Sequence, residues 1–115
     1  VLALAVCAAL GDSYERIQHE RLSLRLGFDI DWIAAAEGRT NANMALLSPE
    51  ETALRELALA VISGHGMGCQ PAVSAATLAL GSEKTTAALL QITRFMSIAT
   101  LCNALDLSLP VPSVF

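Results

Sequence analysis

Apolar residues recur along the chain in about six segments, most of which have the three- and four-residue spacing of one helical face. Glycine or proline stands between neighbouring segments, where such residues end one helix or start the next. We therefore predict an all-α fold, a bundle of about six helices. The predicted helices cover residues 1–10, 13–26, 30–37, 49–63, 72–80 and 83–105.

The first predicted helix, residues 1–10, is apolar on every side, so we expect it to be buried. Gly11 ends this helix, and Asp12 is suited to cap the next one. Glu15 follows at the third helical position and completes an arrangement like a capping box. A structural role at the helix start therefore competes with any catalytic role for Asp12 and Glu15.

The later helices also carry start signals. The clearest is Ser48-Pro49-Glu50-Glu51, with serine at the cap, proline at the first position and glutamate at the third. Ser82 is the expected cap of the last helix, in which Arg94 is the only charge between residues 85 and 105. This helix is apolar on two sides, so we expect a second subunit to cover part of it. The tail, residues 106–115, contains two prolines and is expected to be extended.

The composition indicates one domain that associates with copies of itself. The length of 115 residues fits a single domain, residues 1–115. Hydrophobic residues make up 54% of the chain and aromatic residues only 4%. This aliphatic excess predicts that apolar surface is buried between subunits of a homo-oligomer. The net charge of −4, without a basic patch, argues against nucleic acid as a partner.

Neither a membrane span nor a disulfide framework is expected. No apolar run approaches the roughly 20 residues that cross a bilayer. Cys7, Cys69 and Cys102 are far apart, odd in number and form no CxxC pair. This pattern argues against disulfides and against a zinc site, and no metal or other cofactor is predicted. The simplest setting for these thiols is a reducing cytoplasm, and a redox role for Cys7 or Cys69 is only weakly supported.

The strongest candidate for chemistry is the pair Glu15 and His19, one helical turn apart. Leu22 and Leu26 lie in the same sector of the helix, so we expect the pair to be partly shielded from water. A carboxylate favours the charged imidazole and burial disfavours it, so such a pair can carry a proton near neutral pH. The alternative is an ordinary i,i+4 helix pair worth a few tenths of a kcal/mol. The spacing leaves both interpretations open.

Arg94 and His65 are the candidates for holding a substrate carboxylate. A guanidinium can bind a carboxylate through two hydrogen bonds, but Arg94 also suits an ion pair with a protein carboxylate. His65 stands in the run Gly64-His65-Gly66-Met67-Gly68, which predicts a flexible loop able to contact a ligand. No strand precedes this run, so it is not a nucleotide-binding fingerprint.

Several runs of the chain together carry a family resemblance. The first is Asp12-Ser13-Tyr14-Glu15-Arg16-Ile17-Gln18-His19, followed by Leu26-Gly27-Phe28-Asp29 and Ile33-Ala34-Ala35. The later ones are LSPEETALRELALAV and ITRFMSIATLCNALDLSLP. In these runs the chain resembles the carboxymuconolactone decarboxylase and alkylhydroperoxidase-like (AhpD-like) family. The resemblance implies an AhpD-like subunit that forms a homotrimer or a dimer of trimers, with His19 at the position of the family's histidine.

The first run departs from the C-x-x-C-x-x-x-H pattern of the family's peroxidases. Those members use two cysteines as a redox pair, and here Asp12 and Glu15 stand in their places. A carboxylate cannot act as an attacking or resolving thiol, so thiol peroxidase activity is not expected. The peroxidases also carry a relay glutamate further upstream, at a position that falls just before Val1. That acid is either missing or outside the sequence.

The residues and the resemblance together favour a decarboxylase-like lyase. His19 would move a proton on or off carbon in a small carboxylate, and Glu15 would orient the imidazole. Arg94 or His65 would hold the carboxylate. The alternative is a non-catalytic or small-ligand-binding oligomer of the same fold, in which these groups serve structure or binding alone. The sequence leaves open whether the chain is an enzyme, and it does not specify a substrate.

Overall fold

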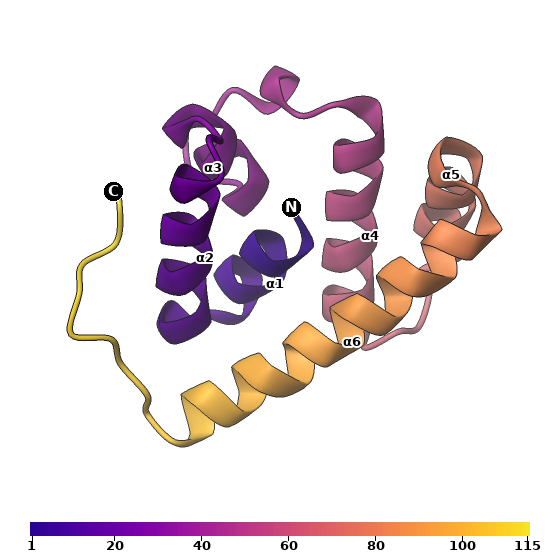
Figure 1. Ribbon diagram of the computed structural model, residues 1–115. Helices are drawn as coiled ribbons and strands as arrows, with labels where there is room; N and C mark the ends of the chain where they lie inside the picture. The colour runs from indigo at the N-terminus through magenta and orange to yellow at the C-terminus, as the bar shows by residue number, and fades with distance from the viewer.

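The computed structural model describes all 115 residues and contains helices but no strand (Figure 1). The α-helices are α1 (Leu2–Leu10), α2 (Ser13–Arg25), α3 (Ile30–Glu37), α4 (Pro49–Gly64), α5 (Gln70–Leu80) and α6 (Ser82–Ala104). A short 3₁₀ helix, η1 (Met44–Leu46), precedes α4. The predicted all-α class and number of helices are therefore confirmed. None of these helices combines the length and apolar character that a membrane crossing requires.

Helix α1 lies at the centre of the molecule, where it contacts α2, α3, α4 and α6 (Figure 1). Its residues Leu4, Ala5, Val6 and Cys7 are at most 2% exposed, as expected of a helix without a polar face. Gly11 ends α1 in the left-handed conformation, with φ 69 and ψ 19. Because α2 begins two residues later, the central helix fixes where α2 starts.

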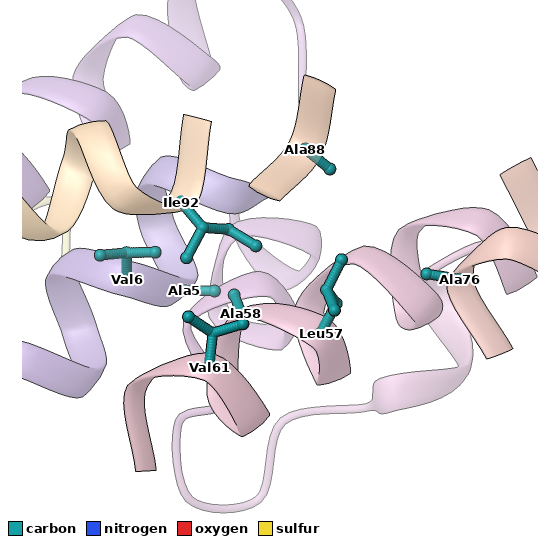
Figure 2. Packing of buried hydrophobic residues seen from close by; sticks show 8 residues of the cluster. All are labelled: Ala5, Val6, Leu57, Ala58, Val61, Ala76, Ala88 and Ile92. Atoms are coloured by element: carbon teal, nitrogen blue, oxygen red, sulfur yellow. The ribbon is translucent and has the colours of Figure 1, made fainter. Parts of the chain in front are cut away.

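Two buried clusters hold the helices together. The larger joins α1, α4, α5 and α6 and consists of Ala5, Val6, Leu57, Ala58, Val61, Ala76, Ala88 and Ile92 (Figure 2). The smaller joins α1 and α3 to the segment before α4 and consists of Leu4, Ile33, Ala35, Ala36 and Leu47. Both clusters are rich in alanine, which allows neighbouring helix backbones to approach closely.

The helix starts at Ser48 and Asp12 have different caps. At Ser48 the predicted capping box is complete, because its hydroxyl accepts from the amide of Glu51 at 3.2 Å and the Glu51 carboxylate accepts from the amide of Ser48 at 2.8 Å. At Asp12 only the first half forms, since its carboxylate accepts from the amide of Glu15 at 3.2 Å. The side chain of Glu15 makes no return bond and is left for other contacts.

Two helix starts differ from the prediction. Ser82 is not a cap, because it is already the first residue of α6, and Gly81 precedes it without a side-chain cap bond. Helix α5 begins at Gln70 rather than at Ala72. Pro71 fits inside its first turn because an amide hydrogen there has no partner within the helix.

The C-terminal segment, residues 107–115, is extended as predicted and runs back past α2 (Figure 1). Arg21 of α2 donates to the carbonyl of Pro112 at 2.9 Å and 3.3 Å. Ser113 and Val114 both donate to the carboxylate of Glu20, also on α2. The end of the chain is thus bound to its own second helix.

Candidate functional site

A hollow of about 500 Å³ lies between α2, the second half of α6 and the C-terminal segment, and we call it the His19 hollow. It is lined by Glu15, Gln18, His19, Arg21, Leu22, Arg25, Arg94, Phe95, Ile98, Leu109 and Val111. Three of the predicted site residues, Glu15, His19 and Arg94, therefore lie in one place. They come from two helices that are distant in the sequence.

Glu15 and His19 face each other across one turn of α2. Nε2 of His19 lies 3.5 Å from Oε2 of Glu15, and the two side chains are 26% and 20% exposed, respectively. The side-chain amide of Gln18 donates to Oε1 of Glu15 at 3.4 Å, so the carboxylate has a neighbour at each oxygen. Glu15 therefore lies on the Nε2 side of the imidazole.

The surroundings of His19 favour a neutral imidazole. Burial lowers the pKa of His19, and the charge and hydrogen bond of Glu15 oppose this shift without cancelling it. The ring of Phe95 on α6 contacts His19 edge-on, with centroids 5.5 Å apart and planes at 86°. At neutral pH His19 is therefore able to accept a proton.

Shielding of the pair was expected from leucines on the same helix, but its source is different. Leu22 is 41% exposed and Leu26 is 67% exposed, so neither is buried over the pair. Phe95 supplies an aromatic cover from another helix. The expectation of partial burial is correct, while the residue that provides it could not be identified from the spacing on α2.

Arg94 is free of any ion pair with the protein, which was the alternative role expected for it. Its guanidinium donates to the side chain of Gln91 at 3.5 Å and lies 6.0 Å from the ring centroid of Phe95. The six ion pairs within 4.0 Å all involve other residues. Arg94 is also exposed, so its charge faces the hollow and water.

Two further arginines, both from α2, make the hollow suited to an anion. Arg25 is exposed, whereas Arg21 is engaged with the carbonyl of Pro112. Glu15 is the only acidic residue in the lining. The hollow therefore combines one carboxylate and one imidazole with three guanidinium groups, an excess of positive charge.

The structure does not bring His65 to this hollow. His65 ends α4 as its C-cap, with φ 50 and ψ 39, and is exposed in the turn that leads to α5. Gly66 and Gly68 in the same turn also have positive φ angles. Arg94, and not His65, is the residue positioned to hold a carboxylate beside His19.

A second group of charged residues was not predicted from the sequence. We call it the glutamate–arginine cluster: Arg16, Glu20, Glu37 and Arg39. The side chains of Glu20 and Glu37 are 0% and 1% exposed. Arg39 binds Glu37 at 2.7 Å and Glu20 at 3.4 Å. Arg16 lies 3.8 Å from Glu37 and 3.7 Å from Glu20. The i,i+4 spacing of Arg16 and Glu20 indicates that these two residues can form an ion pair. It does not distinguish a buried pair from an exposed one, because both have the same spacing.

The two carboxyl groups of this cluster have different pKa values. Burial and, to a lesser extent, the nearby Glu20 together raise the pKa of Glu37 to about 7, against the opposing effect of Arg39. Burial also acts to raise the pKa of Glu20, but its hydrogen bonds to Ser113 and Val114 outweigh burial and hold the pKa below the usual value. Glu37 is therefore largely protonated at mildly acidic pH, at which Glu20 is ionised.

The remaining candidates for chemistry are a cluster of metal ligands and the thiol of Cys7. No group of three or more His, Cys, Asp or Glu residues is placed to hold a metal ion. Burial raises the pKa of Cys7 to about 12, and the negative charge of Asp12 adds to this shift. Cys7 consequently lacks the thiolate that redox chemistry requires at neutral pH.

Comparisons of the chain with family models, with curated protein sequences and with solved structures found no match. The function is therefore inferred from the residues of the His19 hollow.

Proposed function

We propose that the chain is a carboxymuconolactone decarboxylase-like lyase in which His19 transfers a proton at a carbon atom of a small carboxylate. The observation that carries this proposal is the His19 hollow itself. It places an imidazole of lowered pKa beside a carboxylate and opposite an arginine that has no ion-pair partner. A partly buried base with a nearby, unengaged cation is the pattern of a site for an anionic substrate.

Each side chain has a distinct role in this proposal. Arg94, with Arg25, binds the substrate carboxylate and orients the reacting carbon toward the imidazole of His19. When CO₂ leaves, the electron pair of the broken bond stays on carbon, and carbon takes its proton from His19. Because the lowered pKa leaves the resting imidazole neutral, the ring first takes this proton from water through its exposed part, and Glu15 stabilises the protonated ring until the transfer. Glu15 is thus the orienting residue and His19 the proton carrier.

We further propose an AhpD-like assembly, a homotrimer or a dimer of trimers in the cytoplasm. Hydrophobic residues make up 54% of the chain, yet only 20 of 115 residues are buried in the single subunit. The large apolar side chains exposed on α5, on α6 and at the C-cap of α6 are Leu78, Leu90, Leu101 and Leu105, at 61% to 90%. Such a surface favours association. Sedimentation equilibrium tests this proposal, and a monomer at micromolar concentration would contradict it.

A second candidate is a small-ligand-binding oligomer without catalysis. The observation that favours it is the exposure of Arg25 and Arg94, because an open hollow excludes little water during a reaction. In that case carboxylates bind at the arginines, while Glu15 and His19 form an ordinary helix pair. The two candidates agree on ligand binding and differ in proton transfer.

The deciding experiment follows proton transfer to carbon directly. The protein is incubated in D₂O with a panel of small mono- and dicarboxylates, and NMR records deuterium incorporation at the carbon that loses its carboxylate, together with release of CO₂. We expect His19→Ala to lower turnover by about 10²–10⁴-fold, the usual contribution of a general acid–base group. His65→Ala is the matched control, because His65 lies outside the hollow. Turnover that survives His19→Ala would refute the lyase, and binding without turnover in the unaltered chain would support the second candidate.

A further inference from the structure

The lining of the His19 hollow is partly charged and partly apolar. Five of its eleven residues are hydrophobic: Leu22, Phe95, Ile98, Leu109 and Val111. They come from α2, α6 and the C-terminal segment, so each of the segments that enclose the hollow contributes to the apolar part. A ligand that occupies the hollow therefore contacts hydrocarbon as well as charged groups.

Phe95 places apolar surface beside both of the groups that would act on a carboxylate. Its ring centroid lies 5.5 Å from that of His19, and the guanidinium of Arg94 lies 6.0 Å from the same centroid of Phe95. The imidazole and the guanidinium thus have one aromatic neighbour in common. A ligand that is bound at Arg94 and reaches His19 would lie along this ring, which favours a hydrocarbon next to the carboxylate.

On α2 the residues of the hollow form two rows. Because positions three and four apart share a helical face, Leu22 continues the row of Glu15 and His19 toward the end of the helix. Arg21 and Arg25 lie on the adjacent row. The side chain of Leu22 is 41% exposed, so it offers a ligand apolar surface next to the imidazole.

Helix α6 and the C-terminal segment continue this apolar surface. Ile98 is four residues beyond Arg94, so it lies one turn from the guanidinium on the same face of α6. Leu109 and Val111 line the hollow from the C-terminal segment, and Val111 is 38% exposed. The expected position of a bound carboxylate therefore has apolar side chains on both sides of the hollow.

Arg21 holds the C-terminal segment and is not free to bind a ligand. Its Nε and Nη2 both donate to the carbonyl of Pro112, at 3.3 Å and 2.9 Å. Only the guanidinium groups of Arg25 and Arg94 are left for a carboxylate. A second carboxylate on the same ligand would face Glu15 or the apolar lining, where a charge without a partner is unfavourable.

We propose that the His19 hollow selects a monocarboxylate with a compact branched or aromatic hydrocarbon body, and that Leu22, Ile98 and Val111 recognise this body. The proposal rests on the function proposed above, because it names the class of carboxylate that the site takes. The volume of about 500 Å³ lies within the range of small-molecule sites, about 300–1,000 Å³. It leaves room for a body of several carbon atoms beside the carboxylate.

The test is calorimetric titration of the full chain with three probes. 4-Methylpentanoate and succinate have equal numbers of non-hydrogen atoms, but the far end is an isopropyl group in the first and a second carboxylate in the other. Acetate has the carboxylate without a body. One buried methylene changes affinity by about fourfold, so we expect 4-methylpentanoate to bind at least about tenfold more tightly than succinate or acetate. Succinate binding as tightly as 4-methylpentanoate, or saturable binding of neither, would overturn the proposal.

Two variants test whether the apolar lining causes this preference. Val111→Ser and Ile98→Ala should each lower the preference for 4-methylpentanoate over acetate by about three- to tenfold. Val114→Ser is the matched control, because Val114 is on the same segment but outside the hollow, and its bond to Glu20 uses only the backbone amide. A preference that is unchanged in both lining variants would refute this recognition surface.

Binding and turnover separate this proposal from the lyase. Calorimetry needs no reaction and can also be carried out on His19→Ala. If 4-methylpentanoate is preferred but His19→Ala retains turnover, the lyase fails and the ligand class stands. If turnover depends on His19 but succinate binds as tightly as 4-methylpentanoate, the ligand class fails alone.

Discussion

The imidazole of His19 meets the ring of Phe95 edge-on, and this contact bridges α2 and α6 at the base of the hollow. An aromatic ring in this position displaces water from the imidazole, which disfavours its charged form. The lowered pKa of His19 therefore depends on a residue of another helix.

Replacement of Phe95 should raise the pKa of His19. In Phe95→Ala the imidazole becomes hydrated while Glu15 stays in place, so we expect the pKa of His19 to rise. An NMR titration of the His19 ring protons measures it. Phe28→Ala is the control, because Phe28 packs on Trp32 and does not line the hollow. A fall in the pKa of His19 would show that Phe95 does not act through desolvation.

Replacement of Arg94 should weaken ligand binding without weakening the fold. Because Arg94 has no carboxylate partner in the protein, Arg94→Ala leaves no buried charge unpaired. The free energy of unfolding should therefore change by less than about 0.5 kcal/mol. Loss of a charge-assisted bond to a carboxylate ligand should raise Kd by about 10- to 100-fold. Calorimetric titration with small carboxylates measures this. Unchanged affinity would place the ligand elsewhere.

The incomplete cap at Asp12 should be replaceable. Asp12 is 0% exposed, and its Oδ2 has no hydrogen-bond partner, so burial of its charge opposes the benefit of the cap. We expect Asp12→Ser to keep the stability or increase it, and Asp12→Ala to lose about 1 kcal/mol. Urea denaturation measures both. Ser48→Ala, which breaks a complete capping box, gives the loss of stability with which the loss in Asp12→Ala is compared. A large destabilisation by Asp12→Ser would reveal a further role for the carboxylate.

Gly38 should tolerate a side chain less well than Gly27. Both have positive φ angles, 74 and 89, so alanine at either position costs about 1–2 kcal/mol in backbone strain. A methyl group at Gly38 would also displace the guanidinium of Arg55, whereas the space beside Gly27 is open. The difference in unfolding free energy between Gly38→Ala and Gly27→Ala isolates this contact. Equal losses would show that Arg55 moves without cost.

Stability should depend on pH through Glu37. Its pKa of about 7 in the folded chain is above the usual glutamate value, so the folded state binds the extra proton. The contribution of Glu37 is fully present below about pH 4 and is lost as the pH rises through about 7. His19, with a lowered pKa, changes stability in the opposite direction, since its contribution increases as the pH rises.

The comparison of the unaltered chain with Glu37→Gln separates these two effects. Urea denaturation at several pH values should show a stability difference between them that changes through the titration of Glu37. A difference that is constant with pH would mean that Glu37 is ionised in the folded state.

The helices were predictable because their signals are local. Gly11 and Gly38 end α1 and α3, and Ser48 starts α4, each through contacts within a few residues. The pair Glu15 and His19 was predictable for the same reason, since both residues lie on one turn of α2. Ser82 failed as a cap because a suitable residue type does not decide where the helix backbone begins.

Contacts between distant segments could not be read from the spacing. Glu20 looks like a solvent-facing helix residue until Val114, which is distant in the sequence, covers it. Phe95 and His19 likewise meet only because α6 crosses α2. Nothing local distinguished Arg94 from His65 as the partner of His19, and the fold alone places one inside the hollow and the other outside it.

The alanines between α1, α4, α5 and α6 have a consequence for how this molecule can change over time. At Ala5, Ala58 or Ala76 a larger side chain has nowhere to go without pushing two backbones apart. Substitutions that preserve the fold are therefore expected outside this core, where the hollow and its covering segment lie. The residues that line the hollow can change while the alanine-rich core stays the same.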